Sequence, residues 1–208
     1  MDTKIVDKSK LTTLAVALRN EQIVAFPTET VYGLGVVYDS KKAIEALKIA
    51  KHRPEDKPFT LMVASKDIIK DFACLDEIKE CLINAFMPGP ITFIFNKKDE
   101  VDPFITNGYS TIAIRYPDDE FVVELIRMVG KPLVVPSANI SGMLPAINHQ
   151  EVLEQMDGSI DYVVEGACTN RIASTIIDLT GEKIKLLRQG EIRLENIKEV
   201  LHASGFSE

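Results

Sequence analysis

Short strand-like runs alternate with helix-like segments along the whole chain, and this alternation restricts the possible fold more than any other feature. Runs such as "QIVAFP" and "STIIDL" have the β-branched content of buried strands, whereas "KKAIEALKIAK" carries apolar residues at helical spacing. Such interleaving is typical of α/β layers, in which helices cover a sheet. The pairs 91–95 with 111–115 and 175–179 with 184–187 have no helical segment between them, which predicts a mixed sheet.

The same periodicities predict the remaining elements. The predicted helices are 11–20, 41–51, 66–72, 76–86, 120–129, 151–156 and 194–203. The predicted strands are 22–27, 33–37, 59–64, 91–95, 111–115, 132–136, 162–166, 174–179 and 184–188.

No linker rich in Pro, Gly or Ser and no internal repeat divides the chain, so we expect residues 1–208 to form a single domain. With 46% hydrophobic residues, 208 residues suffice for one sizeable core. No apolar stretch approaches the roughly 20 residues of a membrane helix. The charged start "MDTKIVDKSK" lacks the apolar region of a secretory signal. We therefore expect a cytoplasmic protein with no membrane contact.

The charge balance and the metal-ligating residues exclude further classes. A net charge of −7 opposes broad binding to nucleic acid, although it leaves room for a local basic pocket. The 3 cysteines form no C-x-x-C pair and the 3 histidines form no H-E-x-x-H motif, so no protein-bound metal is predicted. The chain also lacks a P-loop, a G-x-G-x-x-G turn and a G-x-S-x-G nucleophile motif.

Two stretches in the first third of the chain could carry chemistry. "PTETVYGLG" (27–35) is either a tight turn capped by threonines or a loop whose hydroxyls hold a small polar ligand. In "KHRPEDKPFTLM" (51–62), Lys51 can complement a helix C-terminus. Arg53 and Lys57 lie beyond that helix, and cations converging there suit a polyphosphate.

Two later strands also end in polar residues. In "STIAIRYP" (110–117), alternation places Thr111 and Arg115 on one face, where the arginine can bind a carboxylate or form an edge salt bridge. In "VVPSANISG" (134–142), Ser137 and Asn139 are two residues apart and form either a turn or a ligand contact. Strand ends of this kind are where α/β sheets build ligand sites.

In this order, "PTETVYGLG", the K-x-R-P element of Lys51, Arg53 and Pro54, and "PSANISG" resemble the YrdC-like threonylcarbamoyl-adenylate synthases. The resemblance runs from about residue 11 to about residue 190, and the length is similar to that of the family's short, single-domain form. It implies an α/β fold of the YrdC/RibB-like type, with a twisted mixed sheet flanked by helices around a basic cavity.

The resemblance also implies an activity, that of a nucleotidyltransferase. L-threonine, bicarbonate and ATP would give threonylcarbamoyl-AMP and pyrophosphate, and other proteins would use this product to make threonylcarbamoyladenosine in tRNA. ATP is then a substrate, with Mg²⁺ expected beside it. The expected partners are tRNA-modification proteins, and direct contact with RNA stays open.

Residue by residue, the resemblance implies two groups of contacts. The threonine contacts correspond to Thr30, Met62, Arg115, Val135 and Ser174. The ATP contacts correspond to Lys51, Arg53, Lys57, Thr111, Ser137, Asn139, Pro145 and Arg188. Of these, Lys51 and Arg53 are expected to be catalytic, because they would neutralise the charge that develops as pyrophosphate leaves.

One residue departs from the family pattern, and two other functions compete with the synthase. Many members carry histidine where this chain has Met62, which leaves the shape of the threonine pocket open. The main alternative is an RNA-binding or ribosome-assembly module that uses the same basic cavity, which the acidic net charge opposes. The other is chemistry on carbamoyl phosphate, as in the related domain of hydrogenase-maturation proteins.

Overall fold

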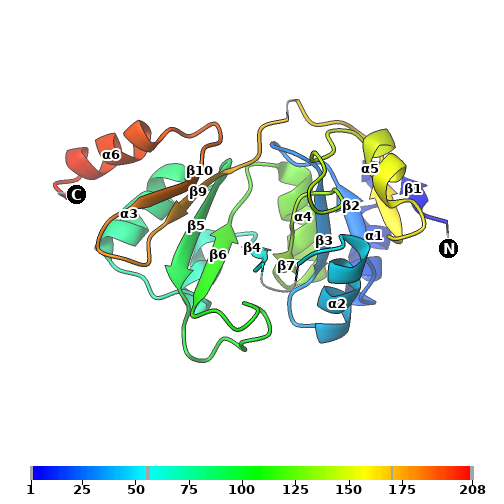
Figure 1. Cartoon of the computed structure of the whole chain (residues 1–208), viewed down its shortest axis with the longest axis horizontal. Helices are drawn as coiled ribbons and strands as arrows, with labels where there is room; N and C mark the ends of the chain where they lie inside the picture. The colour runs from blue at the N-terminus through cyan, green and yellow to red at the C-terminus, as the bar shows by residue number, and fades with distance from the viewer. Residues whose placement is uncertain (1, 55–56, 170, 207–208) are drawn as a thin grey trace.

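A single mixed sheet of ten strands organises the computed structural model, which describes residues 2–54, 57–169 and 171–206 (Figure 1). The strands are β1 (Lys4–Val6), β2 (Val24–Phe26), β3 (Gly33–Val37), β4 (Thr60–Met62), β5 (Ile91–Asn96), β6 (Thr111–Arg115), β7 (Leu133–Val134), β8 (Tyr162–Val164), β9 (Thr175–Asp178) and β10 (Lys185–Arg188). The α-helices are α1 (Leu11–Arg19), α2 (Lys41–Ala50), α3 (Glu77–Phe86), α4 (Glu120–Val129), α5 (His149–Met156) and α6 (Leu194–Ala203). Two short 3₁₀ helices are η1 (Lys8–Lys10) and η2 (Lys66–Asp71).

The strand order is β1-β8-β2-β3-β7-β4-β6-β5-β9-β10, and the sheet mixes both strand orientations. Parallel pairs are β1 with β8, β8 with β2, β4 with β6, and β5 with β9. The β5–β6 and β9–β10 pairs are antiparallel, as expected for strands that follow one another without a helix between them. The predicted mixed α/β sheet is therefore confirmed.

The helices divide the buried apolar residues into two clusters along the sheet. One cluster contains Leu14, Leu47 and Val122 from α1, α2 and α4; the other contains Ile83 and Leu201 from α3 and α6. In Figure 1, β4 and β7 lie in the middle, with α3 and α6 on one side and α1, α2 and α5 on the other. The central strands therefore form the junction between the two clusters.

Side-chain caps define the starts of the two helices that matter for the site. Ser40 accepts a hydrogen bond from the backbone N–H of Ala43 at the start of α2, and Asn148 accepts one from Glu151 at the start of α5. The helix α2 ends where Lys51 follows it, at the entrance to the K-x-R-P element.

The structure differs from the predicted elements in a few places. The segment predicted as a helix over 66–72 forms the 3₁₀ helix η2, and the strand predicted over 59–64 is shorter, spanning only β4. The edge strand β1 was not predicted. No helix in the described part of the chain is both long and apolar enough to cross a membrane.

Candidate functional site

A cavity of about 240 Å³ opens at the junction of the two clusters. Strands β4, β5, β6 and β9 contribute to its walls, together with loops that follow β2 and β7. Most of the predicted site residues line it: Thr30, Arg53, Met62, Arg115, Val135, Ser137, Ser174 and Arg188. The sheet thus brings residues from distant parts of the chain to one hollow.

Arg115, at the end of β6, is 6% exposed and is held by a directed chain of hydrogen bonds. Its Nη1 donates to Thr30 Oγ1 at 3.0 Å, and that hydroxyl lies 2.9 Å from Thr28 Oγ1. Because Thr28 Oγ1 donates to the carbonyl of Val31, the Thr30 hydroxyl must donate to Thr28. The "PTET" segment is therefore both a capped turn and one wall of the cavity.

The rest of the Arg115 guanidinium faces Glu29. Its Nη2 lies 2.8 Å from Glu29 Oε1, which also accepts from the backbone N–H of Asp118. Among the described residues, Arg115 Nε, Arg115 Nη2 and Glu29 Oε2 are buried without a hydrogen-bond partner of good geometry. Arg115 also lines the cavity, so its guanidinium cation can attract an anion that binds there.

Arg188, at the end of β10, lies on the opposite wall and contacts Ser174. Its Nε donates to the Ser174 carbonyl at 2.9 Å, and its Nη2 donates to Ser174 Oγ at 3.0 Å. Ser174 Oγ also lies 2.8 Å from Thr92 Oγ1 on β5. Burial, followed by the nearby Arg115 cation, lowers the pKa of Arg188, which indicates that the two guanidinium groups share one electrostatic environment.

Arg53 is fixed by the loop that precedes β4. Its guanidinium carbon lies 4.3 Å from the centre of the Phe59 ring, and it donates to the carbonyls of Lys57 and Pro58. Burial lowers the pKa of Arg53. The structure therefore brings three guanidinium groups, those of Arg53, Arg115 and Arg188, to one cavity, which suits a polyanionic ligand.

Lys51 does not line the cavity, although its side chain lies next to the cavity wall. It is 2% exposed, and its Nζ donates to the carbonyls of Ser137 and Asn139. Burial, followed by the Arg53 cation, lowers the pKa of Lys51 to about 7. Lys51 thus binds the backbone of the "PSAN" segment from outside the cavity lining. The two carbonyl oxygens compensate its positive charge only weakly.

The "PSAN" segment itself divides its two polar side chains between different tasks. Ser137 lines the cavity, and its hydroxyl donates to Asn139 Oδ1 at 2.6 Å. Asn139 is buried, and its Nδ2 donates to the carbonyls of Ile140 and Met143. Asn139 therefore shapes the loop, while Ser137 faces the cavity.

The chain just before this segment runs very close to β3. A Cβ on Gly33 would lie only 2.5 Å from Val135 Cγ1.

The remaining predicted residues lie outside the cavity lining. Lys57 is exposed, and Thr111 begins β6 on the face that Arg115 shares. The Pro145 carbonyl accepts a hydrogen bond from Arg171. Met62, by contrast, is 2% exposed and, with Val135, gives the cavity an apolar wall.

Three residues of the site were missed from the sequence. Glu29 stands in the "PTET" motif but was not assigned a role, and its pairing with Arg115 spans parts of the chain that only the folded sheet brings together. Thr92 and Phe59 contact predicted residues, Ser174 and Arg53. Neither Phe59 nor Thr92 gave a signal, because each looks like an ordinary strand residue in the sequence.

A second cavity in the structure lacks the predicted site residues. A groove of about 360 Å³ between α3 and α6 is larger, but its lining contains no arginine and no predicted site residue. Within the described residues, no group of three or more His, Cys, Asp or Glu side chains is arranged to hold a metal ion.

Comparison with known proteins identifies relatives of this chain. A family model named Sua5_yciO_yrdC, described as "Telomere recombination", matches residues 16–190. The chain is 37% identical over 198 residues to the threonylcarbamoyl-AMP synthase of Pyrococcus abyssi, an overlap of 94% of this chain and 58% of that protein. It is 37% identical over 190 residues to the synthase of Bacillus subtilis, covering 90% of this chain and 55% of that protein. The chain thus spans little more than half the length of these relatives.

A solved structure gives the same relationship in three dimensions. The crystal structure of P. abyssi Sua5 complexed with L-threonine matches with a TM-score of 0.89 and 35% identity. The match covers 96% of this chain and 60% of that one.

Proposed function

The chain belongs to the Sua5/YciO/YrdC family, and from this premise we propose that it is a threonylcarbamoyl-AMP synthase. It would convert L-threonine, bicarbonate and ATP into threonylcarbamoyl-AMP, pyrophosphate and water. The observation that carries the proposal is the convergence of Arg53, Arg115 and Arg188 on one cavity that also presents hydroxyl groups.

The reaction needs such a concentration of positive charge. The threonine amine adds to the carbon of CO₂ and loses a proton, or adds to bicarbonate with loss of water, and either route gives a carbamate, which is an anion. A carbamate oxygen then attacks the α-phosphorus of ATP, and the bond from that phosphorus to the pyrophosphate oxygen breaks. Two anions must approach each other, so fixed guanidinium groups lower the barrier by neutralising both.

The Arg115 side of the cavity suits the amino acid. Arg115 presents a cation at the cavity that suits a carboxylate, and Thr30 and Ser174 line the same cavity. Met62 and Val135 provide an apolar surface for the threonine methyl group. This arrangement keeps the carboxylate away from the reacting amine and fixes the orientation of the substrate.

Arg53 and Arg188 suit the triphosphate. Both border the cavity, and Ser137 lines it on the loop after β7, with its hydroxyl oxygen able to accept from a hydroxyl or amine of a ligand. Lys51 would act through the loop by holding Ser137 in place. Mg²⁺ would arrive with ATP, bound to its phosphates. The adenylate would then pass to proteins that modify tRNA.

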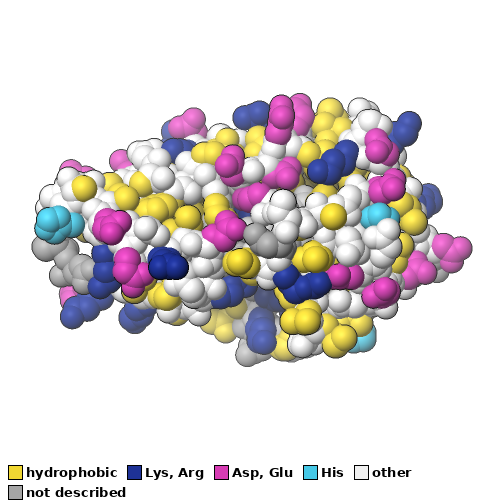
Figure 2. Space-filling model, turned by 90° about the horizontal axis from the view of Figure 1, so that it is seen from above, with side chains coloured by type: hydrophobic (Ala, Val, Ile, Leu, Met, Phe, Trp, Pro, Cys, Tyr) yellow, Lys and Arg dark blue, Asp and Glu magenta, His cyan; other side chains and the backbone are white. Residues whose placement is uncertain are grey.

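The RNA-binding alternative is not favoured. Acidic and basic side chains are interspersed over the face shown in Figure 2, and the net charge is −7. Nucleic-acid binding through phosphates needs a segregated basic surface and weakens steeply as salt rises. A concave cavity lined by both apolar and polar side chains instead suits a small molecule.

One reaction mixture tests the proposal. Purified protein with ATP and bicarbonate should release pyrophosphate and form the adenylate only when L-threonine is added. Arg53→Ala should slow this reaction by about 30- to 1000-fold, equivalent to about 2–4 kcal/mol in the transition state, with the melting temperature retained. Pyrophosphate release that does not depend on threonine, or an Arg53→Ala variant as fast as wild type, would contradict the proposal.

A further inference from the structure

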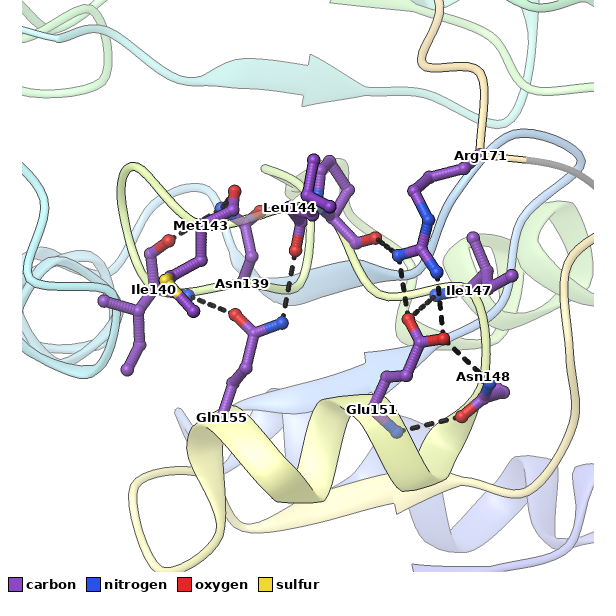
Figure 3. Close-up of polar contacts among 10 residues, drawn as sticks. Asn139, Ile140, Met143, Leu144, Ile147, Asn148, Glu151, Gln155 and Arg171 are labelled. Carbon is purple, nitrogen blue, oxygen red and sulfur yellow. Dashed lines mark hydrogen bonds and ion pairs between the residues drawn. The ribbon is translucent and has the colours of Figure 1, made fainter.

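The helix α5 binds the loop that carries Ser137 through two side chains one turn apart. Gln155 Oε1 accepts from the backbone N–H of Ile140 at 3.1 Å, and Gln155 Nε2 donates to the Leu144 carbonyl at 3.2 Å. One turn earlier, Glu151 Oε2 accepts from the backbone N–H of Ile147. Residues four apart share a helix face, so one face of α5 contacts the 136–147 loop at three points between Ile140 and Ile147 (Figure 3).

Arg171 joins this arrangement from a different part of the chain. Its Nη1 lies 2.8 Å from Glu151 Oε2 and its Nη2 lies 2.9 Å from Glu151 Oε1, a two-point contact. The same Nη1 donates to the Pro145 carbonyl. Arg171 therefore binds both α5 and the 136–147 loop (Figure 3).

These contacts connect the two walls of the cavity. Arg171 lies in the connection from β8 to β9, which passes from one hydrophobic cluster to the other and leads to Ser174. Ser174 is held independently by Thr92 and Arg188. Among the described residues, two hydrogen bonds join the loop that carries Ser137 to the β8–β9 connection: Arg171 donates to the Pro145 carbonyl, and the backbone N–H of Cys168 donates to the Ile147 carbonyl.

We propose that Arg171, Glu151 and Gln155 are positioning residues that set the distance between the Ser137 wall and the Ser174 wall for binding of the ATP phosphates. This inference rests on the proposed function. None of the three side chains lines the cavity, so each acts through the 136–147 loop.

The ion pair between Arg171 and Glu151 should fix the position of the loop more than it stabilises the fold. The side chains of Arg171 and Glu151 are 34% and 27% exposed, and pairs of that exposure contribute little to folding. The hydrogen bond to Arg171 is the main reason that the pKa of Glu151 lies below its ordinary value, so the carboxylate stays charged near neutral pH. Loss of Arg171 should therefore release the loop without unfolding the chain.

Equilibrium binding and thermal melting of the full chain test the inference. Arg171→Ala and Gln155→Leu should each weaken ATP binding on the order of tenfold, because a small displacement of the loop misplaces its contacts. L-threonine binding should change less than about twofold, and the melting temperature should change by less than about 2 °C. Arg171→Lys, which keeps the charge but loses the two-point contact, should fall between wild type and Arg171→Ala.

The matched control is Arg127→Ala, which removes an arginine from another surface ion pair, with Glu124 on α4. It should leave binding of both ligands unchanged. Unchanged ATP affinity in Arg171→Ala and Gln155→Leu would overturn the inference, as would an equal loss for both ligands with a lower melting temperature. If wild type bound neither ligand, the proposed function would fail first, and the inference with it.

Discussion

Arg115 and Lys51 are both almost completely buried, yet they have different surroundings and different tasks. Arg115 forms an ion pair with Glu29 through Nη2, and among the described residues its Nε has no hydrogen-bond partner. Within the described part of the chain, the acceptors of Lys51 are the backbone carbonyls of Ser137 and Asn139, and a second cation, Arg53, lies nearby. A buried charge is costly unless it is paired. Arg115 is therefore suited to bind an anion, and Lys51 to shape a loop.

Replacing Arg115 should separate the two substrates. Arg115→Ala should raise the KM for L-threonine by about 10- to 100-fold, because charge-assisted hydrogen bonds are lost, with little change in the KM for ATP. Steady-state pyrophosphate release, with each substrate varied in turn, gives both values.

A second variant controls for the carboxylate left behind. Glu29 would lose its ion-pair partner in Arg115→Ala, so the double variant with Glu29→Gln should melt at a higher temperature but keep the raised threonine KM. Equal increases in both KM values would show that Arg115 does not select between the substrates.

The pKa of Lys51 gives a pH dependence of folding. The folded value of about 7 lies below the ordinary value of 10.5, so between these pH values the unfolded chain binds a proton that the folded chain does not. The free energy of unfolding should therefore rise with pH over this window, by up to about 1.4 kcal/mol per unit. Urea unfolding at pH 7, 8 and 9 measures this slope.

Lys51→Met provides the comparison, since it removes the titrating amine while all other groups remain. The variant should have a smaller increase in stability between pH 7 and 9 than wild type. If stability rose equally with pH in both proteins, the pKa of Lys51 would not be lowered toward 7 in the folded protein.

At the scale of elements, the site depends on strand ends that meet only after folding. Arg115 ends β6 and Arg188 ends β10, while Ser174 immediately precedes β9. The turn after Arg188 approaches the backbone before β9 so closely that it admits only glycine. A Cβ on Gly190 would lie 2.4 Å from both Ala173 O and Thr175 N.

Gly190→Ala should therefore displace Arg188 from Ser174. We expect a loss of about 1–3 kcal/mol in the free energy of unfolding, because the overlapping atoms belong to the backbone. We also expect a higher KM for ATP. Gly181→Ala is the matched control, since the nearest atom to its Cβ is 4.0 Å away and the residue lies in the neighbouring β9–β10 turn. Equal stability of the two variants would contradict this explanation.

Periodicity predicted most elements, because long amphipathic helices and buried strands have strong sequence patterns. It missed β1, which is a short, exposed edge strand without alternation, and it read η2 as an α-helix because a 3₁₀ turn has a similar apolar spacing. For the site, ordered motifs identified residues that line the cavity, such as Ser137. Motifs could not reveal that Lys51 points behind the loop, because spacing along the chain does not define side-chain direction.

At the scale of the whole molecule, the cavity lies where two hydrophobic clusters meet. The acidic chain concentrates Arg53, Arg115 and Arg188 at this junction, so its basic character is local. Strands that carry residues of one or the other cluster line the cavity, and by the inference above the contact of Arg171 with Pro145 helps to set the space between its walls. The central claim is that one basic cavity holds both an amino acid and a triphosphate.

A crystal structure of the protein with L-threonine and a non-hydrolysable ATP analogue tests this claim most directly. The account predicts the threonine carboxylate within hydrogen-bonding distance of Arg115 and the phosphates within reach of Arg53 and Arg188, in the same cavity. Either ligand bound elsewhere, for example in the groove between α3 and α6, would contradict it.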